Sequence, residues 1–175
     1  GDGALAHRTV PGGQGEVRTK PVMGGRELQA IARTRTDAVR EIGRGAGYLT
    51  AGLARVAGKV TSIDMHADFV EAARQRLADA GVTNVALETA EAVNGYTPAG
   101  VFDVVVVTGA VHAVPEKFVR WLKPGGRMFV VRGDSPAQTA VLLTHEGEGR
   151  FREESLFETD LPYLAHAAPV KRFVL

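Results

Sequence analysis

The feature that most constrains this chain is a glycine-rich turn between a short apolar run and a helical pattern. Residues 38–42 form a β-forming run, and Gly43, Gly45 and Gly47 follow before a helical pattern opens at Tyr48. Glycine permits positive φ and close approach of a ligand, and the first N–H groups of a helix point outward unpaired. A strand, a tight turn and a helix N-terminus are therefore predicted, with room for a nucleotide-like cofactor.

Two acidic residues indicate which cofactor this turn would bind. Glu41 stands two residues before Gly43, where it would repel a pyrophosphate but suits a cofactor that carries an amino group. Asp64 ends the next β-run, about 20 residues after Gly43, which is the reach expected of an acid that binds ribose hydroxyls. The alternate spacing also differs from the Gly-x-Gly-x-x-Gly of dinucleotide folds. These features favour S-adenosylmethionine over NAD.

Composition argues against several other classes of function. The 175 residues suffice for one domain, and a formal net charge of +1 without a dense Lys/Arg run makes nucleic acid or an anionic membrane a poor candidate partner. The absence of cysteine excludes disulfides, thiolate metal sites and a cysteine nucleophile. The histidines are scattered, so no metal site is predicted, and neither a signal peptide nor a membrane-length apolar run occurs. A cytoplasmic protein is expected, and no oligomeric state is indicated.

Apolar periodicity predicts the order of the secondary-structure elements. Helices are expected at residues 22–34, 48–57, 67–80 and 115–122, and strands at residues 38–42, 59–64, 84–88, 102–108 and 127–132. A turn at residues 123–126 precedes the last of these strands, and extended segments follow at residues 137–145, 150–159 and 170–175. The fold class predicted is α/β, with a doubly wound, mostly parallel sheet and antiparallel C-terminal edge strands.

Several motifs occur in a particular order along the chain. They are Pro11-x-Gly13-Gln14-Gly15 with Thr19-x-Pro21, Glu41-Ile42-Gly43-x-Gly45-x-Gly47-Tyr48, Asp64, Phe102-Asp103, and Leu122-Lys123-Pro124-Gly125-Gly126. In order and spacing they resemble the protein-L-isoaspartate O-methyltransferase family. The tail around Leu156-Phe157-Glu158-Thr159 looks most like a bacterial branch, with an N-terminus that is short for the family.

The resemblance implies a class I S-adenosylmethionine-dependent, Rossmann-like methyltransferase fold. It also implies methyl transfer to the carboxylate of L-isoaspartyl residues in damaged proteins or peptides, which is a protein-repair reaction. By position, the family's hydroxyl residue falls on Thr19, its ribose-binding acid on Asp64 and its adenine-side acid on Glu91. The full set of predicted cofactor-binding residues is Val17, Glu41, Gly43, Arg44, Gly45, Gly47, Asp64, Met65 and Glu91. Residues 1–21 are then a hairpin segment on the substrate side, and residues 22–175 the methyltransferase domain.

The implied chemistry needs few catalytic groups. A carboxylate is already ionised at neutral pH, so the acceptor requires no general base. The site has to hold an anionic oxygen in line with the sulfonium methyl, and such positioning can lower a barrier by about 7–11 kcal/mol. Thr19, the predicted catalytic residue, would orient the acceptor carboxylate together with neighbouring backbone N–H groups.

Some residues depart from the family pattern and keep other readings open. Arg40 interrupts the first strand, so it is expected to have an acid partner or to reach an edge. Arg44 lies between cofactor glycines, and Glu91 replaces an aspartate. If His112, which follows the strand at residues 102–108, is a base, the acceptor could be a hydroxyl or carboxyl of a small molecule or peptide natural product. A non-catalytic binding module that keeps the fold is the alternative from another class.

Overall fold

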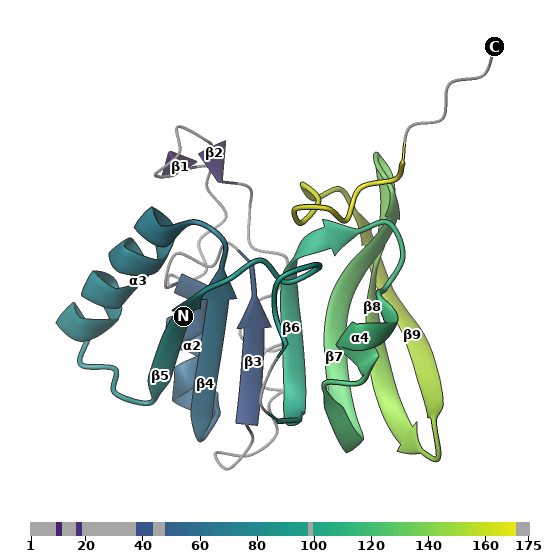
Figure 1. Cartoon of the computed structure of the whole chain (residues 1–175), viewed down its shortest axis with the longest axis horizontal. Helices are drawn as coiled ribbons and strands as arrows, with labels where there is room; N and C mark the ends of the chain where they lie inside the picture. Colours follow the sequence, from purple (N-terminus) through teal and green to yellow (C-terminus); the bar gives the residue numbers. More distant parts are fainter. Residues whose placement is uncertain (1–9, 12–16, 19–37, 44–47, 98–99, 171–175) are drawn as a thin grey trace.

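A single sheet of seven strands organises the protein (Figure 1). The computed structural model describes residues 10–11, 17–18, 38–43, 48–97 and 100–170. The strand order is β5-β4-β3-β6-β7-β8-β9. The strands are β3 (Ala38–Ile42), β4 (Lys59–Asp64), β5 (Val85–Thr89), β6 (Phe102–Val111), β7 (Leu122–Asp134), β8 (Ala137–Gly147) and β9 (Arg150–Thr159). β3 to β7 pair in parallel and β8 and β9 pair antiparallel, so the predicted fold class is confirmed.

Short helices connect the strands and cover the sheet. α2 (Tyr48–Val56) contacts β4, α3 (Ala67–Asp79) contacts β4 and β5, and α4 (Glu116–Val119) contacts β7. Val104 to Val107 of β6 are fully buried and contribute alternately to two apolar clusters, one on each side of the sheet. The prediction of a central strand buried on both faces is therefore confirmed. In the described part of the chain, no helix has the length and apolar character needed to cross a membrane.

The region before β7 differs from the prediction. The expected helix at residues 115–122 is only α4, because the Phe102 N–H donates to the Trp121 carbonyl at 2.7 Å and Leu122 pairs with Phe102 as the first residue of β7. Residues 123–126 do not end the pairing. They lie between paired Leu122 and Arg127 as an irregularity within β7. Pairing with β6 thus converts the end of a predicted helix into strand.

Other boundaries agree with the sequence to within a few residues. β9 has the predicted bounds, and β6 extends beyond residue 108 to Val111. β5 begins at Val85, one residue after the predicted start, although the Asn84 carbonyl accepts from the Val60 N–H at 2.9 Å. Nδ2 of Asn84 donates to the carbonyls of Ala54 and Ala57 at 2.9 and 3.2 Å, at the C-terminal end of α2. The predicted helix at 22–34 and nearly all of the segment at 170–175 lie outside the described residues.

The sheet reverses its direction of growth between β3 and β6. From β3 the chain continues outward through β4 and β5, and then returns to place β6 on the other side of β3. In open α/β sheets, ligands bind outside the carboxyl ends of the strands at such a switch point. The short hairpin of β1 (Val10–Pro11) and β2 (Val17–Arg18) is drawn beyond the same ends, at the top of Figure 1.

Beyond Val107, β6 lies beside a C-terminal segment and no longer beside β3. β3 pairs with β6 as far as Val107, and further along a C-terminal segment lies beside β6. The Ala110 N–H donates to the Pro162 carbonyl at 2.9 Å, and the Leu164 N–H donates to the Ala110 carbonyl at 2.8 Å. The C-terminal segment therefore forms part of the carboxyl edge of the sheet, which the sequence did not predict.

Candidate functional site

Gly43 closes β3 at the switch point in a conformation that only glycine adopts easily. Its φ is +123°, and a Cβ at this position would lie 2.2 Å from Oγ1 of Thr108. The Thr108 hydroxyl donates to the Ile42 carbonyl at 2.9 Å, and the Gly43 N–H donates to the Ile63 carbonyl at 3.0 Å. Backbone from β3 and β4 and the side chain of Thr108 on β6 therefore converge at Gly43, which leaves no room for a side chain at this position.

Glu41, two residues before Gly43 on β3, is fully buried. Its Oε1 accepts hydrogen bonds from the hydroxyl of Thr50 on α2 and from the hydroxyl of Ser62 on β4, the latter at 2.6 Å. Burial raises the pKa of Glu41, and the two hydroxyl donors act in the opposite direction. Its Oε2 is buried and has no hydrogen-bond partner within the described residues. The site thus contains a carboxylate oxygen that an amino group could satisfy.

Asp64 ends the neighbouring strand β4 at the same edge, and Met65 follows it. Asp64 is 9% exposed, and its Oδ1 accepts a hydrogen bond from the His66 N–H at 2.8 Å. Met65 is 45% exposed, which is unusual for a large apolar side chain. A carboxylate that can accept from hydroxyl groups therefore stands beside an exposed apolar surface, an arrangement that suits a nucleoside.

Glu91 follows the end of β5, the third strand of this row. Both of its carboxylate oxygens accept backbone hydrogen bonds at 2.7 Å, Oε1 from Val93 and Oε2 from Asn94. The side chain therefore organises its own turn. The structure brings Glu41, Gly43, Asp64, Met65 and Glu91 to the carboxyl ends of β3, β4 and β5.

Other predicted site residues are described only in part or not at all. Val17 belongs to the β1–β2 hairpin. Arg44, Gly45, Gly47 and the predicted catalytic Thr19 lie outside the described residues.

Sequence reasoning missed three polar residues of this site. Thr50 and Ser62 hold Glu41, and Thr108 contacts Gly43. Each of the three interrupts or ends an apolar pattern, and Thr50 and Ser62 are buried. Polar residues at core positions of otherwise apolar elements were the available signal, since buried polar groups are normally hydrogen-bonded.

Arg40 has the acid partner that the sequence predicted. Its Nη1 lies 3.7 Å from Oε2 of Glu88 on β5, and its guanidinium lies between the rings of Tyr96 and Phe102, with centroids at 5.0 and 4.4 Å. Burial lowers the pKa of Arg40, and the neighbouring Tyr96 and Glu88 act to raise it. Side chains alternate across a strand, so Arg40 lies on the opposite face of β3 from Glu41.

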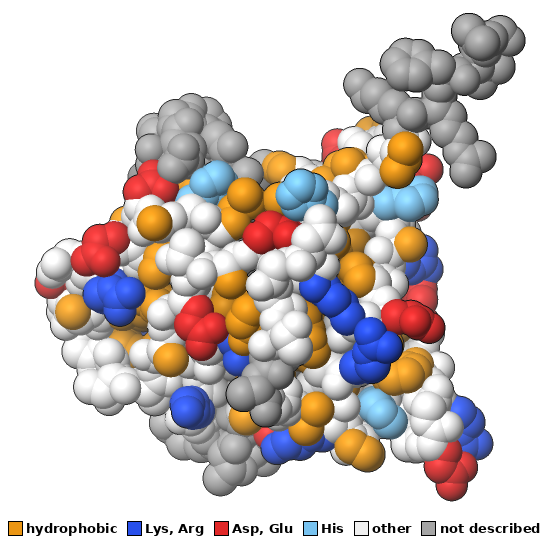
Figure 2. Space-filling view, in the orientation of Figure 1, with side chains coloured by type: hydrophobic (Ala, Val, Ile, Leu, Met, Phe, Trp, Pro, Cys, Tyr) orange, Lys and Arg blue, Asp and Glu red, His pale blue; other side chains and the backbone are white. Residues whose placement is uncertain are grey.

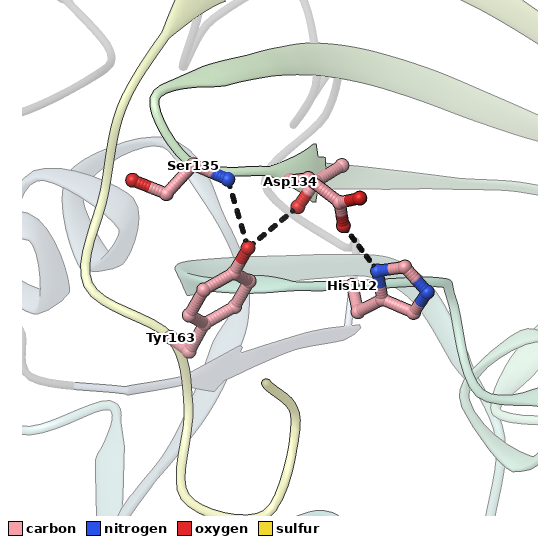
Figure 3. A network of polar contacts seen from close by, with 5 residues as sticks. His112, Asp134, Ser135 and Tyr163 are labelled. Atoms are coloured by element: carbon pink, nitrogen blue, oxygen red, sulfur yellow. Dashed lines mark hydrogen bonds and ion pairs between the residues drawn. The ribbon is translucent and has the colours of Figure 1, made fainter. Parts of the chain in front are cut away.

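A second polar cluster surrounds the end of β6 (Figure 3). Nδ1 of His112 makes a hydrogen bond with the carboxylate of Asp134, at the end of β7. The Tyr163 hydroxyl donates to the Gly133 carbonyl at 3.0 Å and accepts from the Ser135 N–H at 2.9 Å. The turn that carries Asp134 is therefore held by the C-terminal segment.

Two solved structures have the same fold. A protein-L-isoaspartate O-methyltransferase superposes with a TM-score of 0.74 at 24% identity, covering 87% of this chain and 49% of that one. A structure from Plasmodium falciparum, named for the same activity and solved in complex with S-adenosyl-L-homocysteine, gives a TM-score of 0.76 at 16% identity, covering 91% and 80%. The fold is thus that of the class I S-adenosylmethionine-dependent methyltransferases.

Sequence comparison specifies the family within this class. The model described as Protein-L-isoaspartate(D-aspartate) O-methyltransferase (PCMT) matches residues 5–162, and the chain belongs to that family. Protein-L-isoaspartate O-methyltransferases of Methylorubrum extorquens and Methanoculleus marisnigri are 38% and 34% identical to it over 86% and 84% of its length. The chain spans 64% and 66% of the length of these two relatives.

Proposed function

We propose that this chain is an S-adenosylmethionine-dependent enzyme that methylates the carboxylate of L-isoaspartyl residues in proteins or peptides, a repair reaction. Family membership and the names of the relatives support the acceptor. The observation that supports the cofactor is the buried Oε2 of Glu41, which lacks a hydrogen-bond partner among the described residues and belongs to a side chain two residues before Gly43. We further propose that the protein acts in the cytoplasm.

The residues present fit this cofactor, which would supply an electrophilic methyl group on a sulfonium. Glu41 would accept from an amino group, Asp64 would accept from ribose hydroxyls, and Met65 would pack against a nucleoside. Position 43 has to be glycine, because even a Cβ there would overlap Oγ1 of Thr108. Val17, Arg44, Gly45, Gly47 and Glu91 complete the proposed cofactor site.

In the proposed reaction the protein has to position the acceptor carboxylate. An isoaspartyl carboxylate is ionised at neutral pH and needs no base, so the chain has to orient it and exclude water. We propose that residues 1–21 form the substrate-side segment and that Thr19 orients the carboxylate. Residues 22–175 would then form the methyltransferase domain.

Methyl transfer from radiolabelled S-adenosylmethionine tests this function. Label is expected on an isoaspartyl peptide but not on its aspartyl twin, and Thr19→Ala should reduce it. Cofactor binding is measured separately by calorimetry. Asp64→Asn should weaken binding, whereas Asp79→Asn should not, because Asp79 lies at the end of α3 and pairs with Gln75. Cofactor binding without label on the isoaspartyl peptide would overturn the proposed acceptor.

A hydroxyl acceptor is the second candidate, and the His112–Asp134 pair is the observation that favours it. A hydroxyl has to lose a proton, and an imidazole oriented by a carboxylate can act as a general base. Methylation of hydroxyl compounds that depends on His112 would support this candidate. A cofactor-free binding module is excluded if calorimetry detects S-adenosylmethionine binding.

A further inference from the structure

The contact with Asp134 determines which hydrogen bond His112 can offer to a ligand. An ionised carboxylate only accepts hydrogen bonds, so Nδ1 of His112 has to carry the proton in this contact. In the neutral ring the other nitrogen, Nε2, then has a free lone pair. His112 therefore presents an acceptor of fixed tautomer at the carboxyl edge of the sheet.

The backbone around His112 and Asp134 is held by hydrogen bonds, whereas the side chains of both residues are exposed to solvent. The His112 carbonyl accepts from the Gly133 N–H at 3.2 Å, and Tyr163 fixes Gly133 and Ser135 on either side of Asp134. The side chains of His112 and Asp134 are nevertheless 50% and 68% exposed. Histidine side chains are visible along the upper rim of the molecule, over the ends of the parallel strands (Figure 2). The ring is thus oriented yet accessible to a ligand.

His112 lies beyond the switch point. Thr108 contacts Gly43 there, and His112 follows four residues later, just after β6 ends at Val111. The pairing of β6 with β7 shifts register between Val106 and Ala110, so this part of the chain is not a regular strand. A peptide acceptor is much longer than its reacting group, since extended chain spans about 3.3–3.6 Å per residue. A ring beyond the end of the strand can therefore contact a flanking part of the peptide.

We propose that His112, oriented by Asp134, is a positioning residue that binds the acceptor peptide. Its Nε2 accepts a hydrogen bond from a backbone N–H a few residues away from the methylated residue. A backbone contact suits an acceptor whose neighbouring side chains vary, because every residue except proline carries the same donor. This inference rests on the proposed isoaspartyl methylation and specifies how the peptide is held.

Steady-state kinetics with a long and a truncated isoaspartyl peptide test the contact. For the long peptide, His112→Phe should raise KM about three- to tenfold, as expected for one lost hydrogen bond, with kcat little changed. His112→Gln should recover part of the affinity, because its amide oxygen can take the place of Nε2. A truncated peptide that ends before it reaches His112 should not distinguish the variants.

Asp134→Asn tests whether Asp134 acts by fixing the tautomer of His112, because a purely structural role of Asp134 would not depend on that tautomer. The asparagine amide can donate to Nδ1, which moves the ring proton to Nε2 and removes the acceptor. Nitrogen NMR should therefore show the change of tautomer, and KM for the long peptide should rise although the ring is intact. Ser135→Ala and His145→Asn are the controls. Ser135→Ala removes only the adjacent bond to Asp160, and His145 lies at the far end of β8.

The outcomes separate this inference from the proposed function. Unchanged KM in His112→Phe and Asp134→Asn, with normal methylation by the unaltered protein, would overturn the peptide contact and leave the function standing. An equal loss of kcat on long and truncated peptides would assign His112 to the reacting group. Absence of isoaspartyl methylation in the unaltered protein would overturn both proposals.

Discussion

Thr108 occupies the space that a side chain at Gly43 would need. Its hydroxyl donates to the Ile42 carbonyl at 2.9 Å, and this places Oγ1 2.2 Å from where a Cβ of Gly43 would stand. The end of β3 is therefore matched to β6 across the switch point.

Gly43→Ala should lower the free energy of unfolding by more than its backbone strain alone. Strain at an unfavourable φ costs about 1–3 kcal/mol, and the overlap with Thr108 adds to it. Gly133→Ala is the matched control, since Gly133 has a similar φ, +116°, but a Cβ there would meet the Ala137 carbonyl oxygen at 3.4 Å, an ordinary van der Waals contact. Urea denaturation should give a clearly larger loss at Gly43. Equal losses would contradict the steric argument.

Glu41→Gln should alter how stability depends on pH in the cofactor-free protein. Burial raises the pKa of Glu41, so the native state holds this proton more tightly than the unfolded chain does. The stability that Glu41 contributes is therefore present below its pKa in the unfolded chain, and it is lost as the pH rises through the higher pKa of the native state. Denaturation at a series of pH values should show this fall in the unaltered protein and a smaller one in Glu41→Gln. The exposed Glu158→Gln should behave like the unaltered protein.

Arg40→Met should be nearly neutral for stability, whereas Arg40→Ala should be destabilising. Methionine can fill the space between Tyr96 and Phe102, and Glu88 is 48% exposed, so it is not left as a buried unpaired charge. Alanine would leave a cavity, with a loss of roughly 2–4 kcal/mol expected for a large buried side chain. Urea midpoints measure both. A large loss in Arg40→Met would show that the charge itself stabilises the fold.

Tyr163→Phe should loosen the turn between β7 and β8 without disrupting the sheet. The hydroxyl makes two hydrogen bonds, to Gly133 and from Ser135, each worth about 1 kcal/mol. Amide hydrogen exchange should increase at Ser135 and stay unchanged in the centre of β6. Unchanged exchange at Ser135 would mean that the C-terminal segment does not hold this turn.

Much of the fold was predictable because it depends on local sequence. The β-branched run of β6 gave a buried central strand, and the alternation of strands and helices gave the fold class. α4 was predicted too long, since its end was drawn into pairing with β6. Helical periodicity cannot register a competing strand partner that lies elsewhere in the chain.

The sequence by itself determined the strand, the glycine turn and the acids that end successive strands, because residue type and spacing fix these locally. Only the tertiary structure decided their partners: Thr108 beside Gly43, Glu88 and two rings around Arg40, and Asp134 on His112. Each of these contacts joins different strands or their connections. They exist because strand order places distant parts of the chain side by side, and that order is set by packing of the whole sheet.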